Sequence, residues 1–240
     1  MAVNANVLTP RAADRKLFLI VAAGFPLLVL AGYFRTYYFS AFFDVKPLAT
    51  RLAHAHAIVM SVWVLYFTAQ TFLIRAKNVK LHMTMGWVGV ALAITAIVVG
   101  MAAAYDAHLV RNSAPSGIDP HSFFVIPCAD MTVFAILFGA AIYYRKRPAE
   151  HKSLMLLTVV NFLSPVFGRL PLVPPQYLLL WVYGVPDLMA LACFGWYTWK
   201  HKKFNKVFAA GILLMIVSQP IRVMVAGSQA WLAFTAWLAP

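Results

Sequence analysis

The chain has 240 residues, of which 62% are hydrophobic and 11% charged, and its formal net charge is +13. An average soluble domain is about half apolar and about a quarter charged. The apolar content excludes an intrinsically disordered chain. A disulfide-stabilised scaffold is also excluded, because the two cysteines, Cys128 and Cys193, both lie inside apolar runs. The composition therefore predicts a protein that is embedded in a lipid bilayer.

Seven stretches are long and apolar enough to be transmembrane helices, which need about 20 residues each. They cover residues 17–34, 55–74, 84–105, 122–144, 154–174, 177–199 and 207–225. The tail 226–240, with Trp231, Phe234 and Trp237, predicts a helix in the membrane interface. No small-residue cleavage site follows the first span, so we expect a retained anchor. The prediction is one all-α domain over 1–240, a polytopic bundle of seven transmembrane helices.

The cations are divided unequally between the two sides of this predicted bundle. Three precede the first span, three lie between the second and third, and the loops after the fourth and sixth spans carry four each. These are Arg11, Arg15, Lys16, Arg75, Lys77, Lys80, Arg145, Lys146, Arg147, Lys152, Lys200, Lys202, Lys203 and Lys206. The opposite side carries Arg35, Lys46, Arg51 and Arg111. The positive-inside rule then places the N-terminus in the cytoplasm and the C-terminus outside. The basic excess needs no nucleic-acid partner to explain it.

Four histidines mark the two faces of the predicted membrane region. His56 and His121 lie at the outer ends of the second and fourth spans, and His82 and His151 at the inner ends of the third and fifth. Each alone fits an interfacial polar residue, and the small residues that follow His82 fit ordinary close helix packing. Together, two histidines facing each other across a bundle are what six-coordinate haem iron requires.

Short motifs around these histidines resemble the cytochrome b561 family of membrane proteins, which hold two b-type haems. The resemblance rests on "HAIVM" at His56–Met60, "IRAKNVKLH" ending at His82, and "PHSFF" containing His121. It implies a haem-binding core over 55–174, with His56 and His121 on an outer haem and His82 and His151 on an inner one. It also implies electron transfer, with a quinone or small reductant as partner. The seven predicted spans exceed the six usual in that family, and uncharacterised bacterial multi-pass membrane families share similar segments. Either assignment favours a bacterial inner membrane.

Ionisable residues inside the apolar spans form a second group of candidates. They are Asp130, Arg169, Asp187 and Arg222. A charge at the bilayer centre costs about 2.5–3.5 kcal/mol on insertion scales, so such residues face the protein interior and pair. For Asp130 and Asp187 we favour structural ion pairs between helices. Arg169 or Arg222 is a hypothetical partner of the propionates of an outer haem, because guanidinium groups suit carboxylates.

Two other functions fit the same residues. A metal-handling or oxidase-assembly protein would use an outer imidazole-rich site, for which imidazole and carboxylate ligands suit copper or zinc. Its ligands would be His54, His56, Asp106, His108 and His121. The prolines that interrupt the last three spans also occur in transporters, where unwound backbone lines a substrate site. A transporter, or a subunit that binds partner membrane subunits, therefore stays an alternative.

Overall fold

The computed structural model describes residues 10–240 except 46–47, 116 and 171, and of residues 10–15 it describes only the backbone. Lys46, named above, lies outside this description, as do Pro171, one of the prolines in the last three predicted spans, and the side chains of Arg11 and Arg15. The described chain is all-α, as predicted. Its α-helices are α1 (Pro10–Tyr33), α2 (Arg51–Arg75), α3 (Val79–Tyr105), α4 (Pro120–Phe123), α5 (Val125–Tyr143), α6 (Pro148–Asn161), α7 (Ser164–Phe167), α8 (Val185–His201), α9 (Lys206–Ala226) and α10 (Gln229–Leu238). Short 3-10 and π-helical turns join or extend several of them.

Five segments in the described chain are long and apolar enough to cross a membrane. They are Lys16–Tyr38, Arg51–Arg75, Val79–Val110, Pro120–Lys146 and Lys206–Ala226. They correspond to the first four predicted spans and the seventh. The chain is therefore a multi-pass integral membrane protein, embedded in a lipid bilayer.

The fifth and sixth predicted spans have a different structure from the other five. Within 154–174, α6 has only 14 residues and ends at Asn161, and the four-residue α7 follows. Pro165 explains the break, because it lacks the N–H that would continue the helix. Within 177–199, a π-helical turn, η6 (Leu180–Gly184), precedes the 17-residue α8. Five candidate spans are supported in place of seven.

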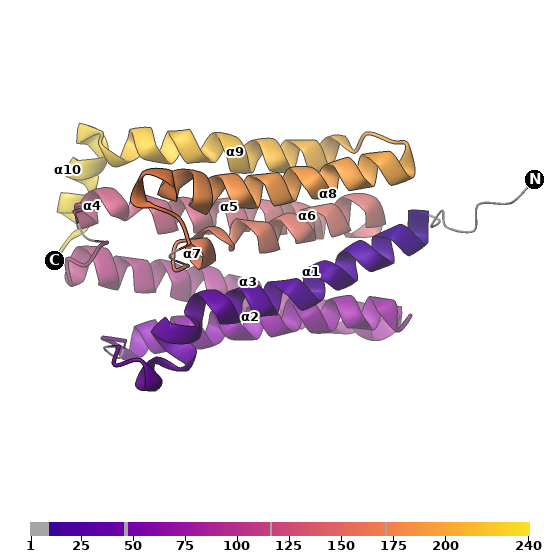
Figure 1. Ribbon diagram of the computed structural model, residues 1–240, viewed down its shortest axis with the longest axis horizontal. Helices are drawn as coiled ribbons and strands as arrows, with labels where there is room; N and C mark the ends of the chain where they lie inside the picture. The colour runs from indigo at the N-terminus through magenta and orange to yellow at the C-terminus, as the bar shows by residue number, and fades with distance from the viewer. Residues whose placement is uncertain (1–9, 46–47, 116, 171) are drawn as a thin grey trace, which may run out of the picture.

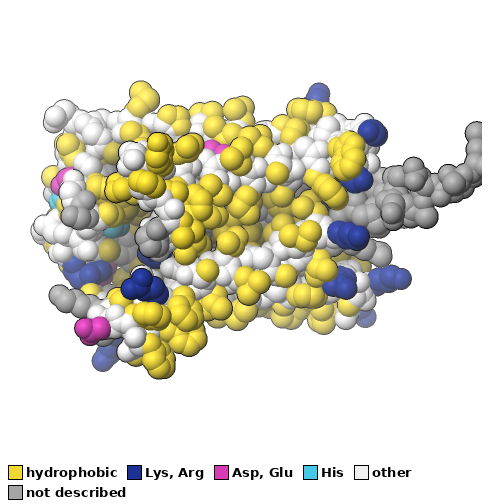
Figure 2. Space-filling view, viewed as in Figure 1, with side chains coloured by type: hydrophobic (Ala, Val, Ile, Leu, Met, Phe, Trp, Pro, Cys, Tyr) yellow, Lys and Arg dark blue, Asp and Glu magenta, His cyan; other side chains and the backbone are white. Residues whose placement is uncertain are grey.

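The long helices lie side by side along the longest axis of the molecule (Figure 1). The start of α1 and the turns α2–α3, α5–α6 and α8–α9 lie at one end, whereas α4, α10 and the C-terminus lie at the other. Lysine and arginine side chains gather at the first end, which we call the basic end (Figure 2). Hydrophobic side chains cover most of the visible surface between the two ends, as expected for a face in contact with lipid. The order in which the spans cross the membrane and the inward orientation of the basic end both stay predictions.

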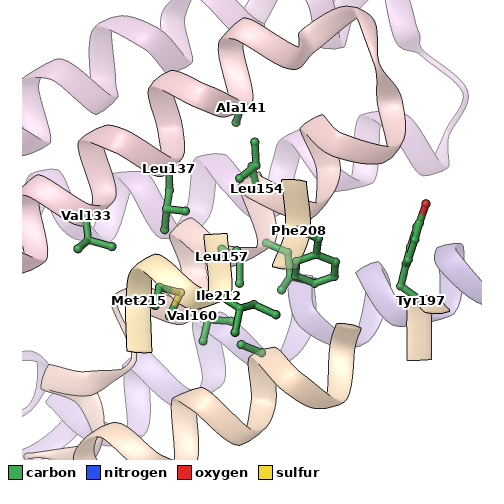
Figure 3. Close-up of a cluster of buried hydrophobic side chains, with 12 residues drawn as sticks. Val133, Leu137, Ala141, Leu154, Leu157, Val160, Tyr197, Phe208, Ile212 and Met215 are labelled. Carbon is green, nitrogen blue, oxygen red and sulfur yellow. The ribbon is translucent and has the colours of Figure 1, made fainter. Parts of the chain in front are cut away.

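The largest hydrophobic core lies where α5, α6, α8 and α9 meet (Figure 3). Leu137 from α5, Leu157 from α6 and Phe208 from α9 are each at most 2% exposed. Gly211 on α9 lets the helices approach, because a Cβ there would lie 2.5 Å from Leu157 Cδ1 and 3.2 Å from Leu137 Cδ2. Close approach at a small residue is a common way for membrane helices to associate without a hydrophobic driving force.

Replacing Gly211 with alanine should therefore destabilise the bundle. The added methyl group must displace two leucines in a packed core, which typically costs about 1–3 kcal/mol. Gly195→Ala on α8 is the matched control, because nothing lies within 4 Å of a Cβ there, and alanine favours a helix by about 1 kcal/mol over glycine. The free energy of unfolding in detergent micelles measures both. Equal stability of the two variants would contradict this packing.

Candidate functional site

His82 and His151 face each other at the basic end of the bundle. The side chain of Asn78 accepts a hydrogen bond from Leu81 N at 3.2 Å and caps α3, so His82 lies in the first turn of that helix. Pro148 begins α6, which places His151 in its first turn as well. The centroids of the two imidazole rings are 6.4 Å apart, with an angle of 73° between the ring planes. The structure thus brings together the predicted inner pair.

One nitrogen of the His151 ring is fixed by the backbone of the neighbouring helix. Nδ1 of His151 lies 2.8 Å from the carbonyl oxygen of Ala141, near the end of α5. A carbonyl only accepts hydrogen bonds, so Nδ1 is the donor, which leaves Nε2 as the ring nitrogen that a metal ion can bind in the neutral imidazole. A carbonyl bound to the second ring nitrogen is the usual way in which a metal-binding histidine is oriented.

Four buried polar atoms, three along α2 and one at the start of α3, have no hydrogen-bond partner in the described structure. They are His56 Nδ1, Trp63 Nε1, Gln70 Oε1 and His82 Nδ1. His56, Trp63 and Gln70 are seven residues apart, so they share one face of α2. An unpaired polar atom in a water-free interior costs several kcal/mol. This face of α2 and the start of α3 therefore retain polar groups that a bound group or ordered water would satisfy.

The room beside α3 changes over the turns that follow His82. A Cβ at Gly86, one turn after His82, would meet nothing within 4 Å, whereas a Cβ at Gly89 would lie 2.8 Å from the ring of Tyr66. The Tyr66 hydroxyl donates to the backbone carbonyl of Met85 and accepts a hydrogen bond from Gln70 Nε2 at 2.9 Å. Tyr66 and Gln70 thus fix the contact between α2 and α3. Sequence reasoning did not single out Tyr66, whose only signal is a phenol one turn before Gln70 in an apolar helix.

The predicted outer pair is less closely associated. No ring contact joins His56 and His121 in the described part of the chain. The backbone carbonyl of His121 accepts a hydrogen bond from Trp231 Nε1 at 2.9 Å, which fastens α10 to α4. Asp119 caps α4 by accepting from Ser122 N at 2.7 Å, and this hydrogen bond lowers the pKa of its carboxyl group. The pairing of His56 with His121 stays a prediction.

Arg169, the proposed partner of an outer-haem propionate, lies within electrostatic range of His56. Its charge is close enough to act on the His56 imidazole. Arg169 also donates to the Pro165 carbonyl at 2.8 Å and stacks over the ring of Tyr33, 4.4 Å from the centroid. The exposed Arg169 therefore keeps donors for an anionic group near His56.

Arg222 has a different role from Arg169. Nη1 of Arg222 on α9 donates to Oδ1 of Asp130 on α5 at 2.5 Å, and its side chain is 3% exposed. Arg222 also donates from Nη2 to the Ser218 hydroxyl at 3.0 Å. The predicted structural ion pair is confirmed for Asp130. Because Arg222 is paired with Asp130, Arg169 is the remaining candidate partner of a propionate of the predicted outer haem.

Among the residues that the structure describes, Asp187 forms no ion pair, so the second expected pair is not observed. Asp187 accepts a hydrogen bond from Gln219 Nε2 at 2.9 Å, and Gln219 is neutral. Arg169, in the segment that follows α7, lies over the ring of Tyr33 near the end of α1.

The alternative outer metal site does not assemble. Among the described residues, no group of three or more histidine, cysteine or acidic side chains lies close enough to hold a metal ion. Asp106 binds Arg111 at 2.9 Å, His108 Nδ1 lies 2.5 Å from the Ser113 carbonyl, and the ring of His54 contacts Tyr37. The five proposed ligands thus have separate partners or lie apart.

Comparison with known protein families, curated proteins and solved structures finds no match to this chain. No family is identified, and the resemblance to cytochrome b561 proteins stays a prediction from the motifs. The function is therefore argued from the geometry alone.

Asp130→Asn should destabilise the protein strongly. It leaves the Arg222 guanidinium buried without a counter-ion, and breaking a buried pair on one side typically costs about 3–5 kcal/mol. Replacing both residues with leucine and methionine should recover much of that loss. Arg111→Gln, which breaks an exposed pair with Asp106, is the control and should cost at most about 1 kcal/mol. Denaturant titration in micelles measures all three, and equal losses for Asp130→Asn and Arg111→Gln would contradict the assignment.

Proposed function

We propose that this membrane protein binds a b-type haem between α3 and α6, with His82 and His151 as axial ligands, and transfers electrons. The observation that carries the proposal is the 6.4 Å separation of the two ring centroids. A metal–imidazole bond is about 2 Å long, so two rings on opposite sides of one ion have centroids roughly 6 Å apart. The two side chains thus have the spacing of a shared ion before any ligand is present.

The number of protein ligands favours haem over a bare metal ion. A structural zinc site uses four protein ligands and a catalytic one three, and the described residues offer no third ligand beside this pair. Haem iron requires only axial ligands from the protein, because the macrocycle supplies the rest. Two histidines with no further ligand are therefore better suited to haem.

The surrounding residues fit the charge and orientation that haem requires. The Ala141 carbonyl holds the His151 ring with Nε2 free, and the lysines and arginines of the basic end suit the two propionates. When bound, haem supplies a reversible one-electron change at iron. The first turns of α3 and α6 and the Ala141 carbonyl would hold the two imidazoles in place around the bound group.

A second, outer haem is an extension of the same proposal. His56 and His121 are its predicted ligands, and Arg169 beside His56 is the predicted partner of a propionate. A quinone or small reductant is the proposed electron donor, and partner membrane subunits and an inner-membrane location belong to the same hypothesis.

His82→Ala and His151→Ala should each abolish or strongly reduce haem bound at the basic end. The test is the absorption spectrum of protein purified after haem-supplemented expression, oxidised and then reduced, with haem quantified per chain. Wild-type protein should show Soret and α bands typical of b-type haem. A ratio of two haems per chain that falls to one in each variant would establish the outer haem as well.

His201→Ala is the matched control for these substitutions. His201 also lies at the basic end, where it stacks on Tyr197 with ring centroids 4.4 Å apart. Its replacement should leave haem content unchanged. A wild-type protein without haem bands, or three histidine variants with the same haem content as wild type, would refute the proposal.

A further inference from the structure

A polar cluster lies inside the membrane region, away from the histidine pair, where α5, η6, α8 and α9 meet. It contains the Asp130–Arg222 ion pair, Ser218, Gln219, Tyr183 and Asp187. Arg222 is 16 residues beyond the start of α9, so at 1.5 Å per residue it lies about 24 Å from the basic end. The hydrocarbon core is about 30 Å thick. The cluster therefore belongs to the half of the bundle opposite the basic end.

Asp187 differs from Asp130 in its surroundings. Asp130 has the Arg222 guanidinium at 2.5 Å, whereas Asp187 has only the neutral amide of Gln219 at 2.9 Å. Asp187 lines a groove of about 410 Å³ between η6, α8 and α9, together with Leu180, Pro220 and Val223. Figure 2 shows acidic side-chain atoms surrounded by hydrophobic side chains on the face formed by α8 and α9. Asp187 is thus a half-buried carboxyl group in a mostly apolar groove, with no cation at ion-pair distance among the described residues.

The charges in the cluster do not balance when both acids are ionised. Arg222 is the cation that faces the two carboxyl groups, and its charge reaches Asp187 as well as Asp130. Tyr183 is the remaining titratable side chain in contact, with Arg222 5.5 Å from its ring centroid. The other helices packed against α8 are α1 and α6, whose described charged residues lie near the basic end. One proton removes the excess negative charge, and a carboxyl group in apolar surroundings gains it in preference to staying ionised.

The backbone near the cluster is interrupted on two sides. Pro220 follows Gln219 inside α9 and removes one helical hydrogen bond, and Tyr183 lies in the π-helical turn η6. Interrupted membrane helices of this kind surround ion sites in transport proteins.

We propose that Asp187 is a reversible proton-binding site within the membrane, held by Gln219 and separated by Arg222 from Asp130, which is paired with that guanidinium. The ligand is a proton taken up from water onto the free carboxylate oxygen, giving a neutral carboxyl group. Loss of the proton leaves a carboxylate that Arg222 attracts. The proposal is independent of haem, because none of its residues contacts the histidine pair.

Dicyclohexylcarbodiimide tests this proposal, because it is lipid-soluble and modifies carboxyl groups only when they are protonated. Full-length wild-type protein in proteoliposomes is treated over a range of pH and digested, and the modified peptides are identified by mass spectrometry. We expect Asp187 to be modified, with a yield that falls several-fold as the pH rises through its pKa. Asp130 should stay unmodified, as the internal control. Sodium or potassium at constant pH should have no effect.

Further variants make a negative result decisive. Asp187→Asn should lose the modification, and Asp187→Glu should retain it if the asparagine variant fails to fold. Asp187→Cys, treated with a lipid-soluble maleimide against a wild-type background, reports whether reagents reach the groove. The proposal would be overturned if the cysteine at position 187 reacts but Asp187 is never modified by the carbodiimide. This must hold at every pH at which the protein stays folded. Protection by sodium at constant pH would overturn it too, because the ligand would then be a metal cation.

Discussion

The rest of the structure depends on one constraint, which is that a polar group in the hydrocarbon region must find its partner inside the protein. The Asp130–Arg222 pair meets this constraint with a 2.5 Å ion pair that joins α5 to α9, and Asn161 reinforces it by donating to the Asp130 carbonyl at 3.0 Å. The same constraint makes the exceptions informative. His56, Trp63, Gln70 and His82 each keep a buried atom without a partner in the described structure, and Asp187 keeps a carboxyl group without a cation. Of these, His82 and Asp187 lie where a bound species is proposed, whereas Trp196 and Thr198 on α8 also keep an unpartnered buried atom and belong to neither site.

The two proposed functions use different parts of the bundle. The histidine pair lies at the basic end, in the first turns of α3 and α6. Each of these helices follows a short turn, which fixes where the helix begins. The proton-binding site lies in the other half, among interrupted helices. Ligands on regular helices suit a cofactor whose geometry must stay fixed. A carboxyl group beside an irregular helix segment suits a site that gains and loses a proton. Between the two, Trp63 packs edge-on against Phe134 and Phe138, 5.2 and 5.6 Å away.

Much of the bundle could be predicted because apolar runs of about 20 residues have few other uses. The prediction failed at 154–174, where composition is apolar throughout but Pro165 stops the helix. The basic loops next to His82 and His151 predicted that these two histidines lie at the same end of the bundle. Their ring separation could not be predicted, because it depends on how α3 and α6 pack across α2 and α5. The partner of Arg222 was also beyond sequence reasoning, since Asp130 is 92 positions away and the choice depends on how α5 packs against α9.

The central claim is that His82 and His151 bind one iron from opposite sides. Near-infrared magnetic circular dichroism of the oxidised, haem-loaded wild-type protein tests it most directly, because this spectrum distinguishes the pairs of axial ligands on low-spin haem. Met155 is an alternative iron ligand to His151, since it follows His151 by one helical turn. It packs against the core cluster that contains Trp63 and Phe134. The geometry predicts the charge-transfer band of bis-imidazole ligation, lost in His82→Ala and kept in His201→Ala. A histidine–methionine band, or a high-spin haem with one axial histidine, would contradict the claim.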